Sequence, residues 1–421
     1  MKPYFAFFAA WRYWTDAEKL QNAYRILQKQ LDCAENSALV TGPEQLGALP
    51  QADCLVAVPM SGAVQRNIMD ASERYPTVLV YAAYVRGNAP EELTDEMLRC
   101  NAAPTVMDVW AVLRREHGCA RLALNGKELT RCLRLFDAYR YVRGAKLLQI
   151  GDTEPWVISN SRDRTSYERR LGVTVEPVAQ SELAERYRAT ADEQAQPYYE
   201  HFRANAQRME EPTEQDLRNA ARMACALHGL LRDHNAQGAA LACFHLLGEG
   251  TTACLGVSYI NDCTGQIASC EGDLDSAVTM LLLKRLTGGH LWMANPALQP
   301  DGTVNFSHCT APLCVCGAEN RPCVLRSHHE SGIGVSLQVE MPLGCAVTAC
   351  RISNEAGSIT VHRGVSIPGP YECACRTQMH VQLEDADHYL HTALGCHQVF
   401  AFEDIADDVR ALAELFGLRL L

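Results

Sequence analysis

Two acidic residues in the segment ASCEGDLDSAVTMLLLKRLTGG stand where a parallel sheet usually binds its ligand. The residues QIASC predict a buried strand, and Glu271 and Asp273 follow it directly. Open α/β sheets bind ligands at the carboxyl ends of their strands, where carboxylates can hold a hard divalent cation or move protons. The simpler alternative is that Asp273 and Asp275 only cap the helix that follows, which is expected to end at Gly288 and Gly289.

Two further residues could act together with this acidic pair. Glu249 lies between two glycines after a predicted strand that ends near Leu247, and His397 enters the predicted last strand, HQVFAF, from a loop. Oxygen ligands with one imidazole suit Mn²⁺ or Mg²⁺ better than a thiolate-seeking ion. Each residue also has a plainer interpretation, as an exposed loop carboxylate for Glu249 and as a hydrogen-bonded structural histidine for His397.

The stretch HCTAPLCVCGAENRPC has the composition of a zinc or iron–sulfur site. It contains His308 and the four cysteines Cys309, Cys314, Cys316 and Cys323. Their spacing gives no paired C-x-x-C motif and no second matching half. We therefore expect reduced thiols that pack as small apolar side chains, and a cysteine-bound zinc or iron–sulfur centre is the alternative.

The elements that must position these residues change in type along the chain. In the first third, and again from about residue 146 to 270, short apolar runs alternate with helical periodicity, which predicts parallel sheets covered by helices. From about residue 323 the apolar residues alternate with period two between turn-rich segments, which predicts an antiparallel sheet or small barrel. A short strand and the helix DIADDVRALAELFG close the chain.

We predict three domains from these patterns. Residues 1–140 form an N-terminal α/β domain, residues 141–312 a second α/β domain that carries the acidic residues, and residues 313–421 a C-terminal barrel domain whose last strand and helix return His397 to the site. The glycine-rich fingerprints of dinucleotide-binding and phosphate-binding loops are missing after every predicted strand. A nucleotide cofactor is therefore not expected.

Composition limits the class of protein and its partners. The chain is 48% hydrophobic and 21% charged, as in folded globular proteins, and its 38 Lys and Arg against 50 Asp and Glu give a net charge of −12. Neither nucleic acid nor an anionic membrane is an expected partner, and no apolar run approaches the roughly 20 residues of a membrane span. The 19 cysteines, spread along the whole chain, favour free thiols and a cytoplasmic location.

Three segments, in their order along the chain, resemble the L-fucose isomerase family. The segment ASCEGDLDSAVTMLLLKRLTGG resembles that family's strand–acid–helix segment, NFSHCTAPLC its HC(G/T) loop, and GCHQVFAFEDIADDVRALAELFGLRLL its terminal histidine-plus-helix segment. The first match is fairly specific, and the order of all three strengthens the others. The resemblance implies two Rossmann-like α/β domains followed by a C-terminal antiparallel β-barrel domain.

The resemblance also implies an activity and a metal site. Family members are metal-dependent aldose–ketose isomerases that hold a divalent ion, usually manganese, through a glutamate, an aspartate and a C-terminal histidine. By position these ligands fall on Glu249, Asp273 and His397, with Glu271 as the alternative to Glu249, because the segment CFHLL departs from the CWPE-like motif of shorter members. Mn²⁺ is the expected cofactor, and Mg²⁺ and Co²⁺ are alternatives.

The roles of the residues follow from the same resemblance. Glu249 and Asp273 would bind the ion and act as acid and base on either side of an enediol. His308 and Glu271 would bind the monosaccharide or sugar derivative. Arg12, just after the first strand, would reach the sugar in a neighbouring subunit's site, which implies a homo-oligomer, a trimer or hexamer. A non-catalytic sugar-binding or regulatory protein is the alternative function.

Overall fold

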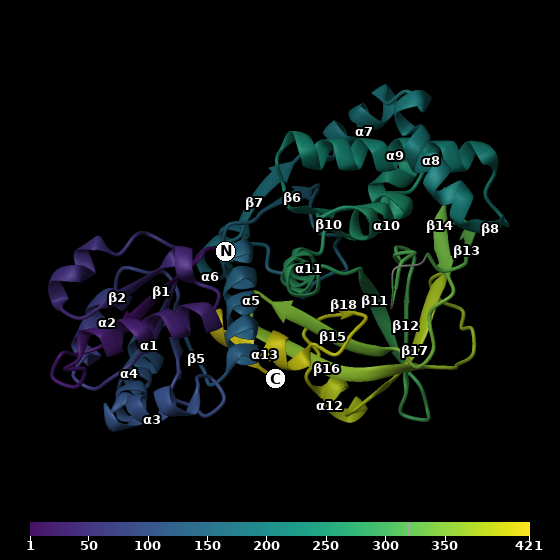
Figure 1. The fold of residues 1–421 in the computed structure, drawn as a ribbon. Helices are drawn as coiled ribbons and strands as arrows, with labels where there is room; N and C mark the ends of the chain where they lie inside the picture. Colours follow the sequence, from purple (N-terminus) through teal and green to yellow (C-terminus); the bar gives the residue numbers. More distant parts are fainter. Residues whose placement is uncertain (316, 318–319) are drawn as a thin grey trace. The chain divides into compact units, whose positions relative to one another are not determined.

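The chain forms two compact units, Met1–Asp137 and Ala138–Leu421 (Figure 1). The structure, a computed structural model, describes residues 1–315, 317 and 320–421. Among these residues, no helix has the length and apolarity that crossing a membrane requires.

The N-terminal unit is built on a five-stranded parallel sheet with the strand order β2-β1-β3-β4-β5. Its strands are β1 (Pro3–Phe8), β2 (Ser37–Val40), β3 (Cys54–Pro59), β4 (Val78–Tyr81) and β5 (Ala120–Ala123). The helices after them are α1 (Ala17–Gln30), α2 (Gln65–Ser72), α3 (Glu91–Arg99), α4 (Ala102–Glu116) and α5 (Gly126–Arg143), of which α5 continues into the second unit. The central strands β3 and β4 are buried along their whole length, which explains their continuous apolar sequences.

The second unit begins with a four-stranded parallel sheet in the order β10-β9-β6-β7. Its strands are β6 (Lys146–Ile150), β7 (Thr174–Val178), β9 (Gly238–Leu241) and β10 (Ile267–Ser269). Its helices are α6 (Arg164–Leu171), α7 (Gln180–Ala189), α8 (Asp192–Asn205), α9 (Glu214–Asp233), α10 (Cys254–Cys263) and α11 (Leu274–Thr287).

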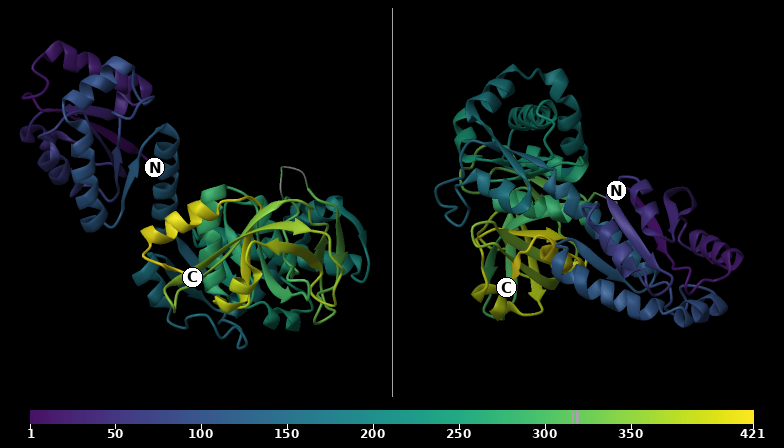
Figure 2. Two further views of the ribbon diagram at one scale, coloured as in Figure 1. Left: turned by 90° about the horizontal axis from the view of Figure 1, so that it is seen from below. Right: turned by 90° about the vertical axis from the view of Figure 1, so that its left-hand side faces the viewer.

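An antiparallel barrel completes this unit. Its strands follow the order β15-β18-β11-β12-β17-β16, and a pairing between β15 and β16 closes the ring. They are β11 (Leu291–Leu298), β12 (Val304–His308), β15 (Ala346–Ser353), β16 (Ser358–Ile367), β17 (Thr377–Leu383) and β18 (Gln398–Ala401). Figure 2 shows these strands, in green to yellow, from two further directions.

Smaller elements surround the barrel. A three-stranded sheet joins β8 (Ala206–Met209), β13 (Cys323–Arg326) and β14 (Ser336–Val339) in the order β14-β13-β8. The short strand β19 (Arg419–Leu420) pairs in parallel with β16. The remaining helices are α12 (Ala386–His391) and α13 (Ala406–Leu415).

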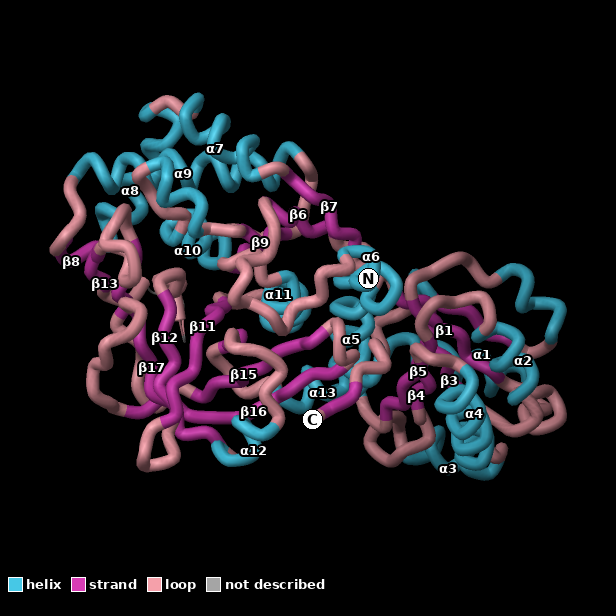
Figure 3. The backbone as a smooth tube through the Cα atoms, turned by 180° about the vertical axis from the view of Figure 1, so that it is seen from behind, coloured by secondary structure: helices cyan, strands magenta, loops and turns pink. Residues whose placement is uncertain are grey.

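Helix α11 is the buried centre of the second unit. It packs against β9 and β10 of the parallel sheet and against β11, β15 and β18 of the barrel (Figure 3). Most of its side chains are buried, so the helix is apolar on nearly every side. The N-terminus of α11, where the acidic segment EGD lies, is therefore enclosed by both sheets.

The structure shows the predicted combination of parallel α/β sheets and an antiparallel barrel, but it divides the chain differently. Strands β11 and β12 precede residue 313, where the barrel domain was expected to begin, and the second parallel sheet and the barrel belong to one compact unit. The first half of β11 is buried at every residue, so it lacks the period-two alternation that marks later strands.

His362 makes the stability of the barrel depend on pH. Its buried side chain lies on β16 beside the rings of His388 and Tyr389, with centroids 6.2 and 5.0 Å away. Burial lowers the pKa of His362 to about 4, and the charges of His388 and Arg410 lower it further against the opposing charge of Asp385. Because an unfolded histidine titrates near 6.5, the folded state is disfavoured by protonation as the pH falls from about 6.5 towards 4.

We expect this histidine to remove up to about 3 kcal/mol of stability across that pH range. Urea unfolding at pH 7 and pH 4.5 measures the loss, and His362→Phe should make it smaller. His391→Asn, at an exposed position of α12, is the matched control and should leave the pH dependence unchanged. An unaltered pH dependence in His362→Phe would contradict the assignment.

Candidate functional site

The turn after β10 holds Glu271 in an uncommon backbone conformation. Glu271 and Gly272 have φ angles of +58° and +63°, so the chain leaves the strand through two left-handed residues. Only glycine fits the second position, because a Cβ there would lie 2.7 Å from the Cα of Thr153. Positive φ at a glutamate is a strained conformation that surrounding contacts must maintain.

The ligand atoms of Glu271, His308 and His397 converge on one point. Nε2 of His397 lies 3.4 Å from Oε1 of Glu271, and Nε2 of His308 lies 3.9 Å from the same oxygen. One ligand atom from each residue lies within 4.8 Å of the other two. The residues come from the turn after β10, the end of β12 and the loop before β18. Nε2 of His397 is buried and has no hydrogen-bond partner among the described residues.

Asp273 holds the opposite side of the His397 ring. Its Oδ2 accepts a 2.7 Å hydrogen bond from Nδ1 of His397, and its Oδ1 accepts a 2.8 Å bond from the backbone N–H of Ser276. Since Nδ1 donates to the carboxylate, Nε2 is the ring atom that faces Glu271. A carboxylate behind a histidine in this way is the usual support of a metal-ligating imidazole.

Arg351 balances the charge of this buried carboxylate. Its guanidinium is fully buried on β15 and donates to Oδ2 of Asp273 at 2.9 Å and to Oδ1 at 3.4 Å. It also donates to the hydroxyl of Ser276, the carbonyl of His397 and the amide oxygen of Asn160. A charged residue inside the apolar strand AVTACRIS is a sequence signal of such a network, but Arg351 was not among the predicted site residues.

Burial and these contacts set the protonation of the cluster. Burial would raise the pKa of Asp273, but Arg351 and His397 hold it well below its usual range. Burial likewise opposes ionisation of Glu271, and His397 nevertheless lowers that pKa to about 2. Burial, with the charge of His397 adding, lowers the pKa of His308 to about 3, so this ring is neutral.

The pKa of His397 is the exception in the cluster. Burial would lower it, but the hydrogen bond to Asp273 and the neighbouring Cys396 and Glu271 raise it well above its usual value. Without an ion, His397 is therefore an imidazolium between two carboxylates. A divalent cation bound there would displace the proton on Nε2, since metal binding requires the deprotonated ligand.

The loop after β6 is fixed to the Glu271 turn. Nε1 of Trp156 donates a 2.7 Å hydrogen bond to Oε2 of Glu271, and the hydroxyl of Thr153 donates to the carbonyl of Gly272. The carboxylate of Glu154 accepts a bond from the backbone N–H of Phe244, and burial raises its pKa, with the charge of Glu271 adding. No sequence motif predicted that this loop belongs to the site, because its residues follow neither a helix nor a strand periodicity and have no recognised ligand spacing.

The structure brings together four of the six residues that the sequence suggested for the site, namely Asp273, His397, His308 and Glu271. Glu249 does not join them. It lies at the end of a short 3₁₀ turn, Phe244–Glu249, and forms a two-pronged ion pair with Arg188 of α7, in which Nε of Arg188 lies 2.9 Å from Oε2. Arg12 belongs to the N-terminal unit, where its guanidinium lies 5.8 Å from the ring centroid of Tyr13.

Asp273 caps the helix as the alternative predicted, but it does not only cap it, and Asp275 is not the cap. Asp273 is the N-cap of α11, and it binds His397 as well. Asp275 is buried in the first turn and accepts hydrogen bonds from the hydroxyl of Tyr167 and the backbone N–H of Asn354. Each oxygen of Asp273 already accepts hydrogen bonds, so in this structure Asp273 supports the cluster while Glu271 offers it a carboxylate oxygen.

The described cysteines near His308 do not form a common site. Cys309, Cys314 and Cys323 are free and buried, and Cys316 lies outside the described residues. Within the described chain, the groups that could hold a metal include Cys314 only together with Asp262 and His290, and none joins two of these three cysteines. Asp262 there accepts backbone N–H bonds from residues 313 and 314, which accounts for it as a loop anchor.

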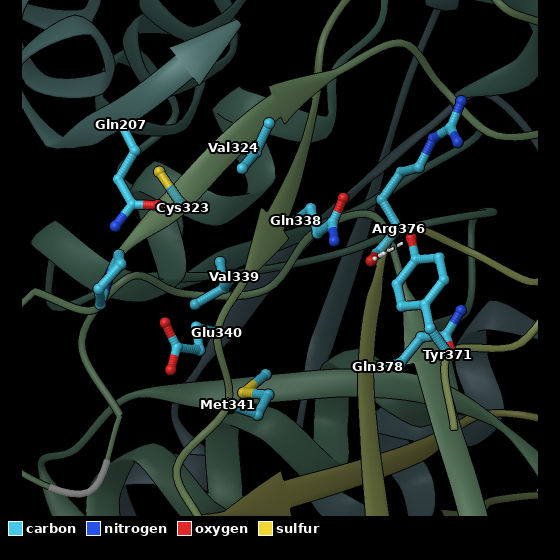
Figure 4. Close-up of a pocket in the computed structure, with 11 residues that line it drawn as sticks. Gln207, Cys323, Val324, Gln338, Val339, Glu340, Met341, Tyr371, Arg376 and Gln378 are labelled. Carbon is cyan, nitrogen blue, oxygen red and sulfur yellow. Dashed lines mark hydrogen bonds between the residues drawn. The ribbon is translucent and has the colours of Figure 1, made fainter. Parts of the chain in front are cut away.

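A hollow of about 310 Å³ lies elsewhere on the second unit (Figure 4). It is lined mainly by β13, β14 and the segment 371–378, and its polar groups include Gln207, Gln338, Glu340, Tyr371 and Arg376. Arg376 donates to the carbonyl and hydroxyl of Ser327, and Gln338 accepts from Arg326. Two of these polar groups thus have partners outside the hollow, and the Glu271 cluster, with the unpartnered Nε2 of His397, is the stronger candidate site.

Comparison with known proteins leaves the family open. The sequence matches no protein-family model. It also matches no curated protein. The resemblance to L-fucose isomerases therefore stays a prediction that depends on the three segments named above.

We expect Arg351→Met to destabilise the second unit by about 3–5 kcal/mol, because it leaves the Asp273 carboxylate buried without its cation. Urea unfolding followed by circular dichroism measures the change. Arg188→Met, which breaks the exposed pair with Glu249, is the matched control and should leave the urea midpoint close to that of the unmodified protein.

The double variant Asp273→Asn with Arg351→Met tests the coupling directly. It removes both charges, so it should cost less stability than Arg351→Met alone. If the two single losses simply add in the double variant, Arg351 does not act through Asp273.

Proposed function

We propose that this protein is a metal-dependent aldose–ketose isomerase that converts a monosaccharide through an enediol. The observation that carries the proposal is the convergence of Glu271, His308 and His397, with an unpartnered, buried imidazole nitrogen directed at a carboxylate. The order of the three family-like segments supports the same activity, since each of them supplies one of these residues.

The donor set fits a divalent cation. Nε2 of His397 and Nε2 of His308 lie 3.4 and 3.9 Å from Oε1 of Glu271. These separations suit three ligand atoms that each lie about 2.1 Å from one ion. The ligand set differs from the one expected, because Glu271 replaces Glu249 and His308 takes the place of Asp273. With two imidazoles, Co²⁺, Fe²⁺ or Zn²⁺ compete with Mn²⁺ for the site.

The ion would supply Lewis acidity and would orient the two sugar oxygens between which the carbonyl moves. The chain's own residues supply the rest. Asp273 and Arg351 fix the ring of His397, and Trp156 fixes the orientation of Glu271. Glu154 lies in the loop after β6, where its backbone N–H donates to the carbonyl of Glu271 at 3.0 Å. Its carboxyl group is our candidate for carrying the proton between the two sugar carbons.

One observation favours a second function, that of a sugar-binding protein without turnover. Of the two residues expected to act as acid and base, Glu249 is paired with Arg188 and Asp273 is fully hydrogen-bonded. In that case the chain would keep the binding site but not exchange the C2 proton.

The first test is proton exchange in heavy water. The protein is stripped with chelator, restored with Mn²⁺ and incubated with a panel of aldoses, and loss of the C2 proton is followed by NMR. We expect metal-dependent exchange together with ketose formation. Sugar binding without exchange would favour the binding protein, and failure to retain Mn²⁺, Co²⁺ or Zn²⁺ would contradict the metal site.

Variants then separate the two ligand assignments. Glu271→Gln and His397→Ala should each weaken metal affinity and exchange by at least about 100-fold, because each removes a proposed ligand. Glu249→Gln is the matched control and should stay within about threefold of the unmodified protein. The reverse result, with Glu249→Gln inactive and Glu271→Gln active, would restore the ligand set expected from the sequence.

A further inference from the structure

Trp156 is a large apolar side chain that is exposed next to the proposed metal site. Its side chain is 53% exposed although its Nε1 donates to Oε2 of Glu271. The N–H of this indole binds Glu271, while much of its apolar surface faces solvent. Apolar surface in contact with water costs free energy, which a ligand that covers the ring would recover.

Two further rings continue from Trp156. Phe244 packs edge-on against it, with the centroids 4.8 Å apart and the planes at 81°, and His328 packs on Phe244 with the centroids 5.7 Å apart. We call Trp156, Phe244 and His328 the aromatic row. The row belongs to three separate loops of the second unit, so it is assembled by the fold and not by one local sequence.

The loop that carries Trp156 is held in place. Arg162 donates to the carbonyls of Thr153 and Val157, and the backbone N–H of Val157 donates to the carbonyl of Glu154. These bonds, with those from Thr153 and Glu154 to the Glu271 turn, fix the ring before any ligand arrives. A pre-organised ring loses little conformational entropy on binding, which is the property of a binding platform.

The cations beside the row are already bound within the protein. Arg376 donates to the carbonyl and hydroxyl of Ser327, and Arg162 donates to the carbonyls of Thr153 and Val157. Neither guanidinium is left to pair with the charged group of a sugar acid or a sugar phosphate, so an uncharged ligand is preferred.

We propose that the aromatic row is the sugar-binding subsite of the protein, on which the apolar C–H face of an uncharged monosaccharide packs against the indole of Trp156. This rests on the proposed function for the identity of the ligand as a sugar. The hydrogen bond from Trp156 to Glu271 then joins substrate binding to a proposed metal ligand, so Trp156 both binds the sugar and positions Glu271.

Equilibrium binding tests the subsite without requiring turnover. The Mn²⁺-loaded protein is titrated with the aldoses of the panel, the corresponding alditols, a uronic acid and a sugar phosphate, by calorimetry and by tryptophan fluorescence. Trp156→Ala should weaken binding of the neutral ligands roughly tenfold. Trp156→Phe, which keeps a ring but loses the N–H, should retain affinity within about threefold while lowering kcat.

Trp11→Phe is the matched control, because Trp11 is 49% exposed and belongs to the N-terminal unit. It should retain both the affinity and the fluorescence change, and the change should be lost in Trp156→Phe.

Equal affinity in Trp156→Ala and in the unmodified protein would overturn the subsite and leave the isomerase proposal intact. Binding through Trp156 without C2-proton exchange would overturn the isomerase and leave the subsite. Tighter binding of the uronic acid or the phosphate would overturn the preference for a neutral ligand, and binding of no sugar at all would overturn both proposals.

Discussion

The buried contact between Arg351, Asp273 and His397 is the constraint on which the site depends. An unpaired carboxylate or guanidinium at this depth would cost much free energy. Here the carboxylate of Asp273 binds the guanidinium of Arg351, the N-terminus of α11 and the imidazole of His397. The contact also ties three elements together, since Arg351 lies on β15, Asp273 begins α11 and His397 precedes β18. The ring of His397 is therefore oriented by the same interaction that joins the central helix to the barrel.

A second constraint acts on the other side of the cluster. The left-handed turn at Glu271 and Gly272 is kept in place by the loop after β6, through the bonds from Thr153, Glu154 and Trp156. Apart from the half-exposed indole of Trp156, the groups that hold each side of the site are backbone groups or buried side chains. This explains how two imidazoles and a carboxylate remain close together although nothing but the fold holds them there.

The sequence predicted the elements better than the contacts between them. Continuous apolar runs identified the buried parallel strands, period two identified β14 to β17, and the strand–acid–helix pattern located the turn that carries the site. Which acidic residue faces the histidines depended on the left-handed turn, and no spacing rule reports backbone φ at a glutamate. Arg351 and Trp156 escaped prediction because their partners lie 78 and 115 residues away in the chain, and a single sequence gives no signal of such pairings.

The position of β18 near the end of the chain determines when the site can form during synthesis. In the barrel it lies between β15 and β11, which do not otherwise pair in the described structure, and it is the last of the six barrel strands in chain order. His397 directly precedes this strand. A nascent chain that has emerged only as far as β17 therefore has an open sheet and two of the three proposed donors, and it gains the third donor at the same moment as the barrel closes. At the proposed metal site, capture of an ion by the newly made protein would therefore wait until β18 has joined the barrel.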